Sequence, residues 1–461
     1  MQPVLCIDFG STYTKVVGID IDEPKILGRT QSFTTVKEDI NIGLEKAIEK
    51  LYKITGIQEW PVRLACSSAA GGLKMIAIGL VPQLTMEAAK RAALSAGAKI
   101  LKTYSYELNE TELDEIAKLK PDIILFTGGI DGGNQKVVLH NAHQLTKCKI
   151  RCPLVYAGNK AVRDEVSKIL KSSDWKVHVA DNVMPVLNEL RIDSARALIR
   201  DIFLEHIVVA KGLSKVQSTI DNILMPTPSA VLLAAELLAY GHIGAKGIGE
   251  LIIVDVGGAT TDVHSVAEGH PTQSNVLMKG LSDLKIKRTV EGDLGARYSL
   301  PSLVEVVGIE GIAATIPTSV EVVHQILKDL EAHPESFVNE PGLLKTLDDV
   351  AAEIAVKESV TRHAGTLEVH YTPFGTVYQQ TGKDLSHVSH VIGTGGPLIY
   401  HHNIRSALKA AQFDPKNPFS LKPTAPNYYI DKQYILAAMG LLSIKYPKQA
   451  LALMKSAIIE V

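Results

Sequence analysis

The hydrophobic pattern of the first 55 residues predicts three strands followed by a helix. Residues 3–8 and 14–20 are apolar runs that indicate two buried strands joined by the turn FGSTY, and residues 24–33 offer a third strand. Residues 39–55 carry apolar side chains at the spacing of one helix face. This segment is therefore expected to form a hairpin, a third strand and an amphipathic helix.

Strands alternate with helices over the next 120 residues. The apolar runs that predict strands lie at 62–68, 72–80, 121–129, 153–158 and 175–181. Residues 85–97 predict a helix with Thr85 as its N-cap and Gly97 as its stop. Because strands that alternate with helices pair in parallel, the segment predicts a parallel α/β layer.

The second half of the chain has a sharper pattern at its two ends than in its middle. Residues 229–241 predict a long apolar helix, and residues 251–266 predict two strands joined by a glycine turn. Residues 267–390 form a more polar, mixed region. Residues 390–411 then predict a strand, a glycine turn and a helix, and residues 434–447 predict a closing helix.

Composition narrows the classes of function. The 461 residues carry 48 Lys and Arg against 50 Asp and Glu, so the formal net charge of −2 offers no basic field for a nucleic acid. With 46% hydrophobic residues the chain can bury a core, yet no apolar run reaches the roughly 20 residues of a membrane span. The four cysteines form no CxxC pair, which favours reduced thiols. We expect a cytoplasmic protein that binds neither nucleic acid nor membrane.

Two segments, CIDFGSTYTKV (6–16) and IVDVGGATTDV (253–263), share one pattern. Each is an apolar strand that ends in Asp, one further residue, a glycine, hydroxyl residues in a tight turn, and a returning strand. Glycine lets the backbone approach a phosphate closely, and the N–H groups that follow form a nest for an anion. The two turns are therefore expected to clamp a polyphosphate from opposite sides.

The candidate ligands in these turns fall into three kinds. The glycines that admit the phosphate are Gly10, Gly257 and Gly258. The hydroxyl donors to phosphate oxygens are Ser11, Thr12, Thr260 and Thr261. The carboxylates that offer hard oxygen ligands for Mg²⁺, through its bound waters, are Asp8, Asp255 and Asp262.

A third segment, VIGTGGPLI (391–399), predicts a strand that ends in Gly393, Thr394, Gly395 and Gly396 before a helix. Glycines without side chains can lie flat against a purine or a ribose, and the start of the helix adds a partial positive charge. Three such segments in this order, about one domain apart, are hard to explain as ordinary turns. They predict a nucleotide site for ATP or ADP with Mg²⁺.

The three segments resemble the phosphate-1, phosphate-2 and adenosine motifs of the actin, sugar-kinase and heat-shock-chaperone superfamily. The resemblance implies an α/β fold with two duplicated ribonuclease H-like (actin-like ATPase) domains around a nucleotide cleft. Domain I would hold residues 1–240 and 430–461, with an α/β insertion at about 60–180. Domain II would hold residues 245–430, with an insertion at about 270–385. The helices at 229–241 and 434–447 would be the two connecting helices.

The same resemblance implies roles for single residues. Asp8 and Asp262 would hold the waters of Mg²⁺, and Asp255 would orient the attacking water. Thr12 and Thr260 would contact the γ-phosphate, and the glycines of the third motif would form the adenine shelf. Ala259 and Pro397 depart from the usual motifs. The motifs do not show which residue would correspond to the catalytic Lys of the chaperones. Lys15 is a candidate for a phosphate contact.

Within the superfamily, the whole chain resembles the MutL/GlmL proteins, which accompany an adenosylcobalamin-dependent glutamate (methylaspartate) mutase. The start CIDFGSTYTK, the run VDVGGATTDVHSV and the ending IGTGGPLIY carry this resemblance. It implies a chaperone-like reactivating factor, with slow Mg-dependent ATP hydrolysis, that helps damaged cobalamin to leave a mutase. The expected partners are a nucleotide and that mutase or a related aminomutase, and a homodimer is one assembly to test.

Three other interpretations stay open at this point. A small-molecule kinase would need an acceptor pocket, for which Glu291, Asp293 and Arg297 are candidates. A reductive activator would need an iron–sulfur cluster, for which Cys148 and Cys152 are poorly spaced. An ATP-binding scaffold or filament would need no turnover at all.

Overall fold

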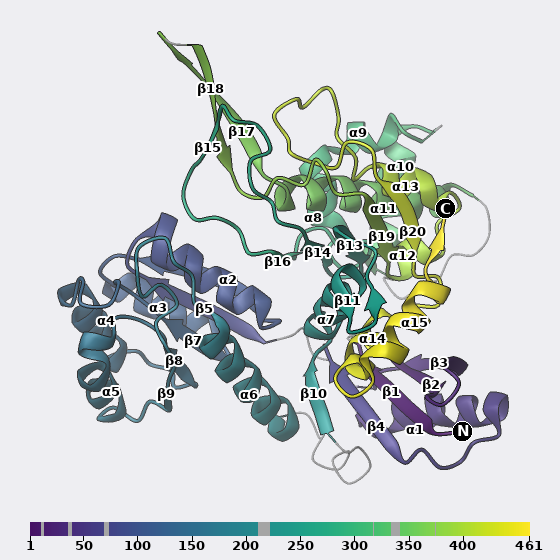
Figure 1. Ribbon diagram of the computed structural model, residues 1–461, viewed down its shortest axis with the longest axis horizontal. Coiled ribbons are helices and arrows are strands. Elements are labelled where there is room, and N and C mark those ends of the chain that lie inside the picture. Colours follow the sequence, from purple (N-terminus) through teal and green to yellow (C-terminus); the bar gives the residue numbers. More distant parts are fainter. Residues whose placement is uncertain are drawn as a thin grey trace. The chain divides into compact units, whose positions relative to one another are not determined.

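The computed structural model divides the chain into two compact units, Met1–Ala230 and Val231–Val461. The structure describes residues 1–10, 13–35, 39–68, 73–210, 222–316, 318–332, 342–373 and 375–461. Each unit is described separately below and labelled in Figure 1. The domain bounds inferred from the sequence, including the place of residues 430–461, stay a prediction. No helix in the described ranges is both long and apolar enough to cross a membrane.

The first unit is built on a five-stranded sheet in the order β10-β4-β1-β2-β3. The first three strands form an antiparallel meander, as the sequence pattern predicted, and β4 and β10 continue the sheet in parallel with β1. Helix α1 (Ile40–Thr55) begins at the Asp39 N-cap and packs Leu44, Ala47 and Leu51 inward. The strands are β1 (Pro3–Phe9), β2 (Tyr13–Asp20), β3 (Lys25–Phe33), β4 (Val62–Ser67) and β10 (Asn222–Pro226).

A second sheet of five parallel strands is inserted between β4 and β10, in the order β6-β5-β7-β8-β9. Its strands are β5 (Lys74–Gly79), β6 (Lys99–Ser105), β7 (Ile123–Phe126), β8 (Leu154–Tyr156) and β9 (Val177–Val179). The helices between them are α2 (Glu87–Ser95), α3 (Glu110–Leu119), α4 (Lys136–Thr146) and α5 (Arg163–Lys171), and α6 (Asp193–Ala210) follows. Side chains of α3, α4 and α5 share a buried core with β5, β7 and β8. The predicted parallel α/β layer is therefore confirmed.

One detail of this insertion differs from the prediction. A π-helical turn at Pro82–Met86 precedes α2, which has no side-chain cap at its start. The Thr85 hydroxyl instead accepts hydrogen bonds from the N–H groups of Leu80 (2.8 Å) and Val81 (3.1 Å). The prediction of Thr85 as a helix N-cap was therefore wrong, because this hydroxyl satisfies the loop that leaves β5.

The second unit carries a six-stranded sheet in the order β16-β14-β13-β19-β20-β21. Strands β13, β14 and β16 are antiparallel, whereas β19 and β20 run parallel to β13. The strands are β13 (Leu251–Val256), β14 (Thr261–Val266), β16 (Ile286–Glu291), β19 (His390–Thr394), β20 (Asn427–Ile430) and β21 (Ile459–Glu460). A buried core joins one face of this sheet to the helices α8 (Leu300–Val307), α11 (Leu343–His363) and α13 (Ile404–Lys409).

The remaining helices include the two expected to connect the domains. Helix α7 (Thr227–Tyr240) covers the predicted apolar run. The predicted closing helix at 434–447 corresponds to α14 (Leu436–Ser443), and a second helix, α15 (Pro447–Ala457), follows it. Pro447 begins α15 because proline lacks the N–H that a continuous helix would need there. The described part of the unit also contains the helices α9 (Ile309–Ala313), α10 (Val320–Ala332) and α12 (Gly396–Ile399).

The two main sheets have the same topology. In chain order each has three antiparallel strands followed by two parallel ones, arranged with the first strand between the second and the fourth. This places β1, β2, β3, β4 and β10 in the roles of β13, β14, β16, β19 and β20. The duplication confirms the predicted fold class of two ribonuclease H-like, actin-like α/β domains with α/β insertions.

A smaller sheet lies in the more polar, mixed region, for which the sequence predicted no elements. It consists of β15 (Val276–Met278), β18 (Gly375–Thr381) and β17 (Thr366–Thr372), in that order. Figure 1 shows β17 and β18 as a long hairpin that extends from the second unit. All of the β17 side chains are exposed or half-buried, which explains why no buried alternation marked the strand.

The core of the second unit contains a fully buried lysine. The Lys383 Nζ donates to the carbonyl oxygens of Lys285 (2.7 Å) and Leu284 (3.0 Å) and to the Ser265 hydroxyl (3.2 Å). His363 contacts the same serine hydroxyl through Nε2 at 2.8 Å. Burial, aided by the charge of Lys287, lowers the pKa of Lys383 from 10.5 to about 7.

This lysine gives the protein a pH-dependent stability. Between pH of about 7 and 10.5 the unfolded chain binds a proton at Lys383 that the folded chain does not, so the free energy of unfolding rises with pH. We expect Lys383→Met to remove a rise of about 1 kcal/mol per pH unit. Urea unfolding of both proteins at about pH 8 and about pH 9.5 measures this, and equal pH dependence of the two would contradict it.

Candidate functional site

The two sequence segments with a shared pattern are closed by the same hydrogen bond in the two units. The Gly10 N–H donates to the carbonyl oxygen of Tyr13 at 3.0 Å, and the Gly257 N–H donates to that of Thr260 at 2.9 Å. A Cβ on these glycines would lie 2.6 Å and 2.9 Å from the same carbonyl oxygens. Each turn therefore requires glycine. Ser11 and Thr12 lie outside the described residues.

In the first unit, the turn sets the surroundings of Asp8. Asp8 lies directly opposite Lys15 on β2, and the Lys15 Nζ is 3.4 Å from its carboxylate. The Thr227 hydroxyl donates to the other carboxylate oxygen at 2.6 Å, and the Cys66 thiol lies 3.6 Å from it. Burial and the charge of Asp8 raise the pKa of Cys66, so the thiol stays protonated.

Sequence reasoning found Asp8 and Lys15 but missed Thr227 and Cys66. Both come from the strands that extend the sheet in parallel with β1, because Cys66 lies on β4 and Thr227 directly follows β10. Parallel neighbouring strands end at the same edge of a sheet. The strand order of the duplicated fold was thus the signal that identifies them.

In the second unit, the same register brings two carboxylates together. Asp255 on β13 lies directly opposite Asp262 on β14. Like charges at opposite positions destabilise a strand pair, so the pair needs a cation. Arg288 on β16 supplies one, because its Nε and a terminal nitrogen lie 2.8 Å and 2.6 Å from one Asp262 oxygen. Arg288 is buried, and sequence reasoning missed it.

The two threonines of this turn have different surroundings. The Thr260 hydroxyl donates to the second Asp262 oxygen at 3.3 Å and is part of the polar edge of the turn. The Thr261 side chain is buried, and its hydroxyl donates to the carbonyl oxygen of Leu294 at 2.7 Å. Gly258 contacts Arg297 and Tyr298, whose atoms lie 3.5–3.6 Å from the position of a Cβ. Their phosphate roles stay predictions.

The third predicted motif lies against the second. Gly395 follows β19 with a positive φ of 93°, and a Cβ there would lie 2.1 Å from the carbonyl oxygen of Val256 and 2.8 Å from an Asp255 carboxylate oxygen. Thr394 pairs with Asp255 across β13 and β19, and its hydroxyl donates to the Asp431 carboxylate at 3.2 Å. A Cβ on Gly393 would meet the Leu408 side chain, whereas Gly396 has open space.

These residues fit a magnesium nucleotide. The second unit presents two facing carboxylates, which are the hard oxygen ligands that Mg²⁺ takes. Close backbone turns with glycine, one in each unit, suit the approach of phosphate oxygens. Lys15 and Arg288 balance part of the carboxylate charge within their own units.

A histidine cluster follows the third motif but is satisfied without a metal. Asp349, His401 and His402 have ligand atoms within 4.8 Å of one another. The Asp349 carboxylate already pairs with Lys345 and contacts the His402 Nδ1 at 2.6 Å. The His401 Nδ1 accepts the Asn403 N–H, so its Nε2 carries the proton and donates to the Asp349 carbonyl oxygen. The cluster anchors the segment after α12 to α11.

Sequence comparison matches the full chain to known proteins. The model of a protein family described as "MutL protein" matches residues 4–458. A relative from Clostridium tetanomorphum, named Protein MutL, is 48% identical over 463 residues and is covered over 100% of both chains.

Solved structures resemble the chain more distantly. The activator of the 2-hydroxyisocaproyl-CoA dehydratase from Clostridium difficile with bound ADPNP is 10% identical, with 98% of this chain and 97% of that chain covered and a TM-score of 0.30. The xylulose kinase from Bifidobacterium adolescentis is 12% identical, with 99% and 93% covered and a TM-score of 0.32.

The close contact between the third and second motifs predicts that one methyl group added at Gly395 strongly destabilises this unit. We expect Gly395→Ala to lower the free energy of unfolding of this unit by roughly 2–4 kcal/mol, because the added Cβ meets the backbone and the φ is positive. Gly396→Ala is the matched control, since a Cβ there has nothing within 4 Å. Thermal unfolding compares the variants, and equal loss in both would contradict the packing described here.

Proposed function

The chain belongs to the MutL protein family, and on this premise we propose that it is an ATP-dependent reactivating factor for an adenosylcobalamin-dependent mutase. The mutase is glutamate (methylaspartate) mutase or a related aminomutase, and the factor helps damaged cobalamin to leave it. The observation that supports this proposal most strongly is the duplicated glycine turn, which carries a carboxylate at the same place in both units. A duplicated phosphate turn suits a nucleotide-driven protein better than an enzyme with one fixed substrate pocket.

We assign the roles of the site residues as follows. Asp8 and Asp262 hold the waters of the metal ion, and the bound Mg²⁺ supplies charge neutralisation for the phosphates. Asp255 accepts a hydrogen bond from the attacking water and orients it. Lys15 and Arg288 position Asp8 and Asp262 through the ion pairs described above. Thr12, Thr260 and the backbone N–H groups of the turns donate to phosphate oxygens.

Arg288 explains how the second unit can carry two facing carboxylates. Two facing carboxylates without a countercharge would repel each other and would displace the strand ends. The Arg288 guanidinium holds one Asp262 oxygen and leaves the other toward Thr260. Asp262 is thereby fixed in position opposite Asp255. Phosphoryl transfer depends mainly on such positioning and charge.

A small-molecule kinase is less well supported. The acids proposed for its acceptor pocket, Glu291 and Asp293, both pair with Arg362 at 2.9 Å and 2.8 Å. Arg362 holds the pKa of Asp293 below its usual range, which makes that carboxylate a poor base. Arg297, the third candidate, is paired with Asp348. These side chains are used within the protein.

The reductive activator and the filament have distinct signatures. Cys148 is buried in the core of the insertion, and burial raises the pKa of Cys152 to about 12, so neither thiol suits a cluster ligand. A filament would show ATP-dependent sedimentation. The proposed factor instead shows slow ATP turnover and needs its mutase for its effect.

The proposal is tested by measuring ATP turnover and reactivation of the mutase together. We expect the wild-type protein to restore a mutase inactivated by damaged cobalamin only with Mg²⁺, ATP and fresh cofactor. Asp255→Asn keeps the shape of the side chain but cannot orient water as a carboxylate does, so it should lower ATP turnover at least about 100-fold and abolish reactivation. Phosphate release and mutase activity are measured with the same samples.

The control variant is Asp201→Asn, an exposed carboxylate on α6, which should behave as the wild type. Asp262→Ala is a poorer choice, because it leaves Arg288 buried without its carboxylate and is expected to destabilise the unit. Equal turnover in Asp255→Asn and the wild type would refute the site. ATP turnover that rises strongly with a sugar or carboxylate would favour the kinase.

A further inference from the structure

The residue that directly follows the fifth strand of each main sheet reaches back toward the site. In the first unit this residue is Thr227, after β10, whose hydroxyl lies 2.6 Å from the Asp8 carboxylate and 3.7 Å from the Cys66 sulfur. In the second unit it is Asp431, after β20, whose carboxylate accepts the Thr394 hydroxyl at 3.2 Å. The duplicated fold therefore brings this position to the strands that carry the site in both units.

The partners of these two residues occupy equivalent places as well. Cys66 pairs with Asp8 across β4 and β1, and Thr394 pairs with Asp255 across β19 and β13. Each unit thus joins the fourth strand, beside the aspartate of its first strand, to the residue after its fifth strand. The contact recurs with different side chains, so it belongs to the duplicated architecture and not to one loop.

The carboxylate of Asp431 is fully buried and has donors on two sides. Its two oxygens accept the N–H groups of Ile435 (3.0 Å) and Leu436 (3.1 Å), where α14 begins, and one oxygen also accepts the Thr394 hydroxyl. The Asp431 N–H donates to the Gly393 carbonyl oxygen at 2.9 Å. Asp431 therefore ties the third motif to the start of α14 through its main chain and its side chain.

The loop that follows this carboxylate has a strained backbone. Tyr434 has a positive φ of 51°, which is uncommon for a bulky residue, and its side chain packs against the core of the unit. Its N–H donates to the Asp431 carbonyl oxygen at 3.0 Å. A neutral side chain such as Ser or Asn is enough to cap a helix start, whereas a buried charge and a strained residue both cost free energy. The arrangement is more costly than a helix cap alone requires.

We propose that Asp431 is a positioning residue for the nucleotide and acts through Thr394. The Thr394 side chain is buried, so its hydroxyl faces Asp431 and not a bound ligand. The bond between them fixes the end of β19 and with it Gly395, which lies against Val256 and Asp255. A nucleoside on the glycines of the third motif is thereby held in one place. This inference rests on the proposed function and adds a residue to its site.

The phosphate turn of the same unit does not depend on this bond. The turn is closed by its own main-chain hydrogen bond, and Arg288 holds Asp262. Loss of the bond between Thr394 and Asp431 should therefore weaken the contacts of the nucleoside more than those of the phosphates. In kinetic terms it should raise the KM for MgATP more than it lowers kcat.

Thr394→Val tests the inference with a small change, because valine keeps the branched shape of threonine and removes the hydroxyl. We expect the KM for MgATP to rise about 10-fold while kcat changes less than about 2-fold, since a hydrogen bond to a charged group is lost. Thr394→Ser, which keeps the hydroxyl, should restore most of the affinity. Magnesium tripolyphosphate, which has no nucleoside, should inhibit Thr394→Val and the wild type at the same concentration.

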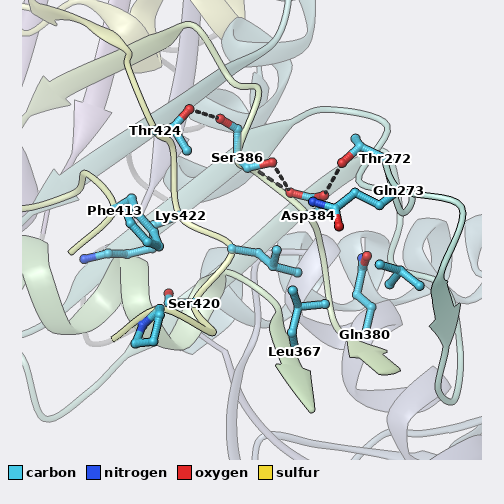
Figure 2. Close-up of a pocket in the computed structure, with 13 residues that line it drawn as sticks. Thr272, Gln273, Leu367, Gln380, Asp384, Ser386, Phe413, Ser420, Lys422 and Thr424 are labelled. Atoms are coloured by element: carbon cyan, nitrogen blue, oxygen red, sulfur yellow. Dashed lines mark hydrogen bonds between the residues drawn. The ribbon is translucent and has the colours of Figure 1, made fainter. Parts of the chain in front are cut away.

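Asp431→Asn is the second variant, and its combination with Thr394→Val completes a double-mutant cycle. Because the two side chains act as one unit, the double variant should raise KM no more than the stronger single one. Asp384→Asn is the matched control and should keep the wild-type KM. This buried carboxylate lines a cavity of about 160 Å³ outside the motifs, and Figure 2 shows its bonds to Ser386 and Thr272.

Thermal unfolding shows which variants are folded at the assay temperature. If Asp431→Asn does not fold, the comparison of Thr394→Val with Thr394→Ser decides alone. A wild-type KM in the folded variants, or equal weakening of MgATP and tripolyphosphate in Thr394→Val, would overturn the inference and leave the proposed function standing. A wild-type protein that neither binds nor hydrolyses MgATP would overturn the proposed function and this inference with it.

Discussion

The hydrogen bond that closes each glycine turn is the constraint on which the site depends. It fixes how the two strands beside the turn are paired, and a slip of one residue would move every side chain to the other face. The same register therefore places Lys15 opposite Asp8 and Asp262 opposite Asp255. Within this register the two units differ at the residue seven positions after the first aspartate.

That position breaks the symmetry of the duplication. In the first unit it holds a lysine, so the carboxylate of Asp8 has its countercharge on the neighbouring strand. In the second unit it holds an aspartate, so the countercharge comes one strand further away, from Arg288. The second unit thus keeps two facing carboxylates at one sheet edge, whereas the first unit has one carboxylate, which is paired with a lysine.

Prediction from sequence succeeded where a local pattern carries the structure. The twin turns, the meander at the start of the chain and the parallel layer of the insertion all follow from strand patterns and glycines. Thr227, Cys66 and Arg288 were missed because their places depend on strand order, which joins segments far apart in the sequence. The small sheet was missed because its strands bury little, and Thr85 was misassigned because its hydroxyl serves the preceding loop.

The central claim is that both glycine turns serve one nucleotide. Calorimetric titration of MgATP into the wild type, Gly10→Ala and Gly257→Ala tests it directly, with circular dichroism to confirm that each variant is folded. The account predicts one nucleotide per chain in the wild type and loss of binding in both variants, because each added Cβ meets the carbonyl oxygen that closes its turn. A folded variant of either turn that binds MgATP as tightly as the wild type would contradict it.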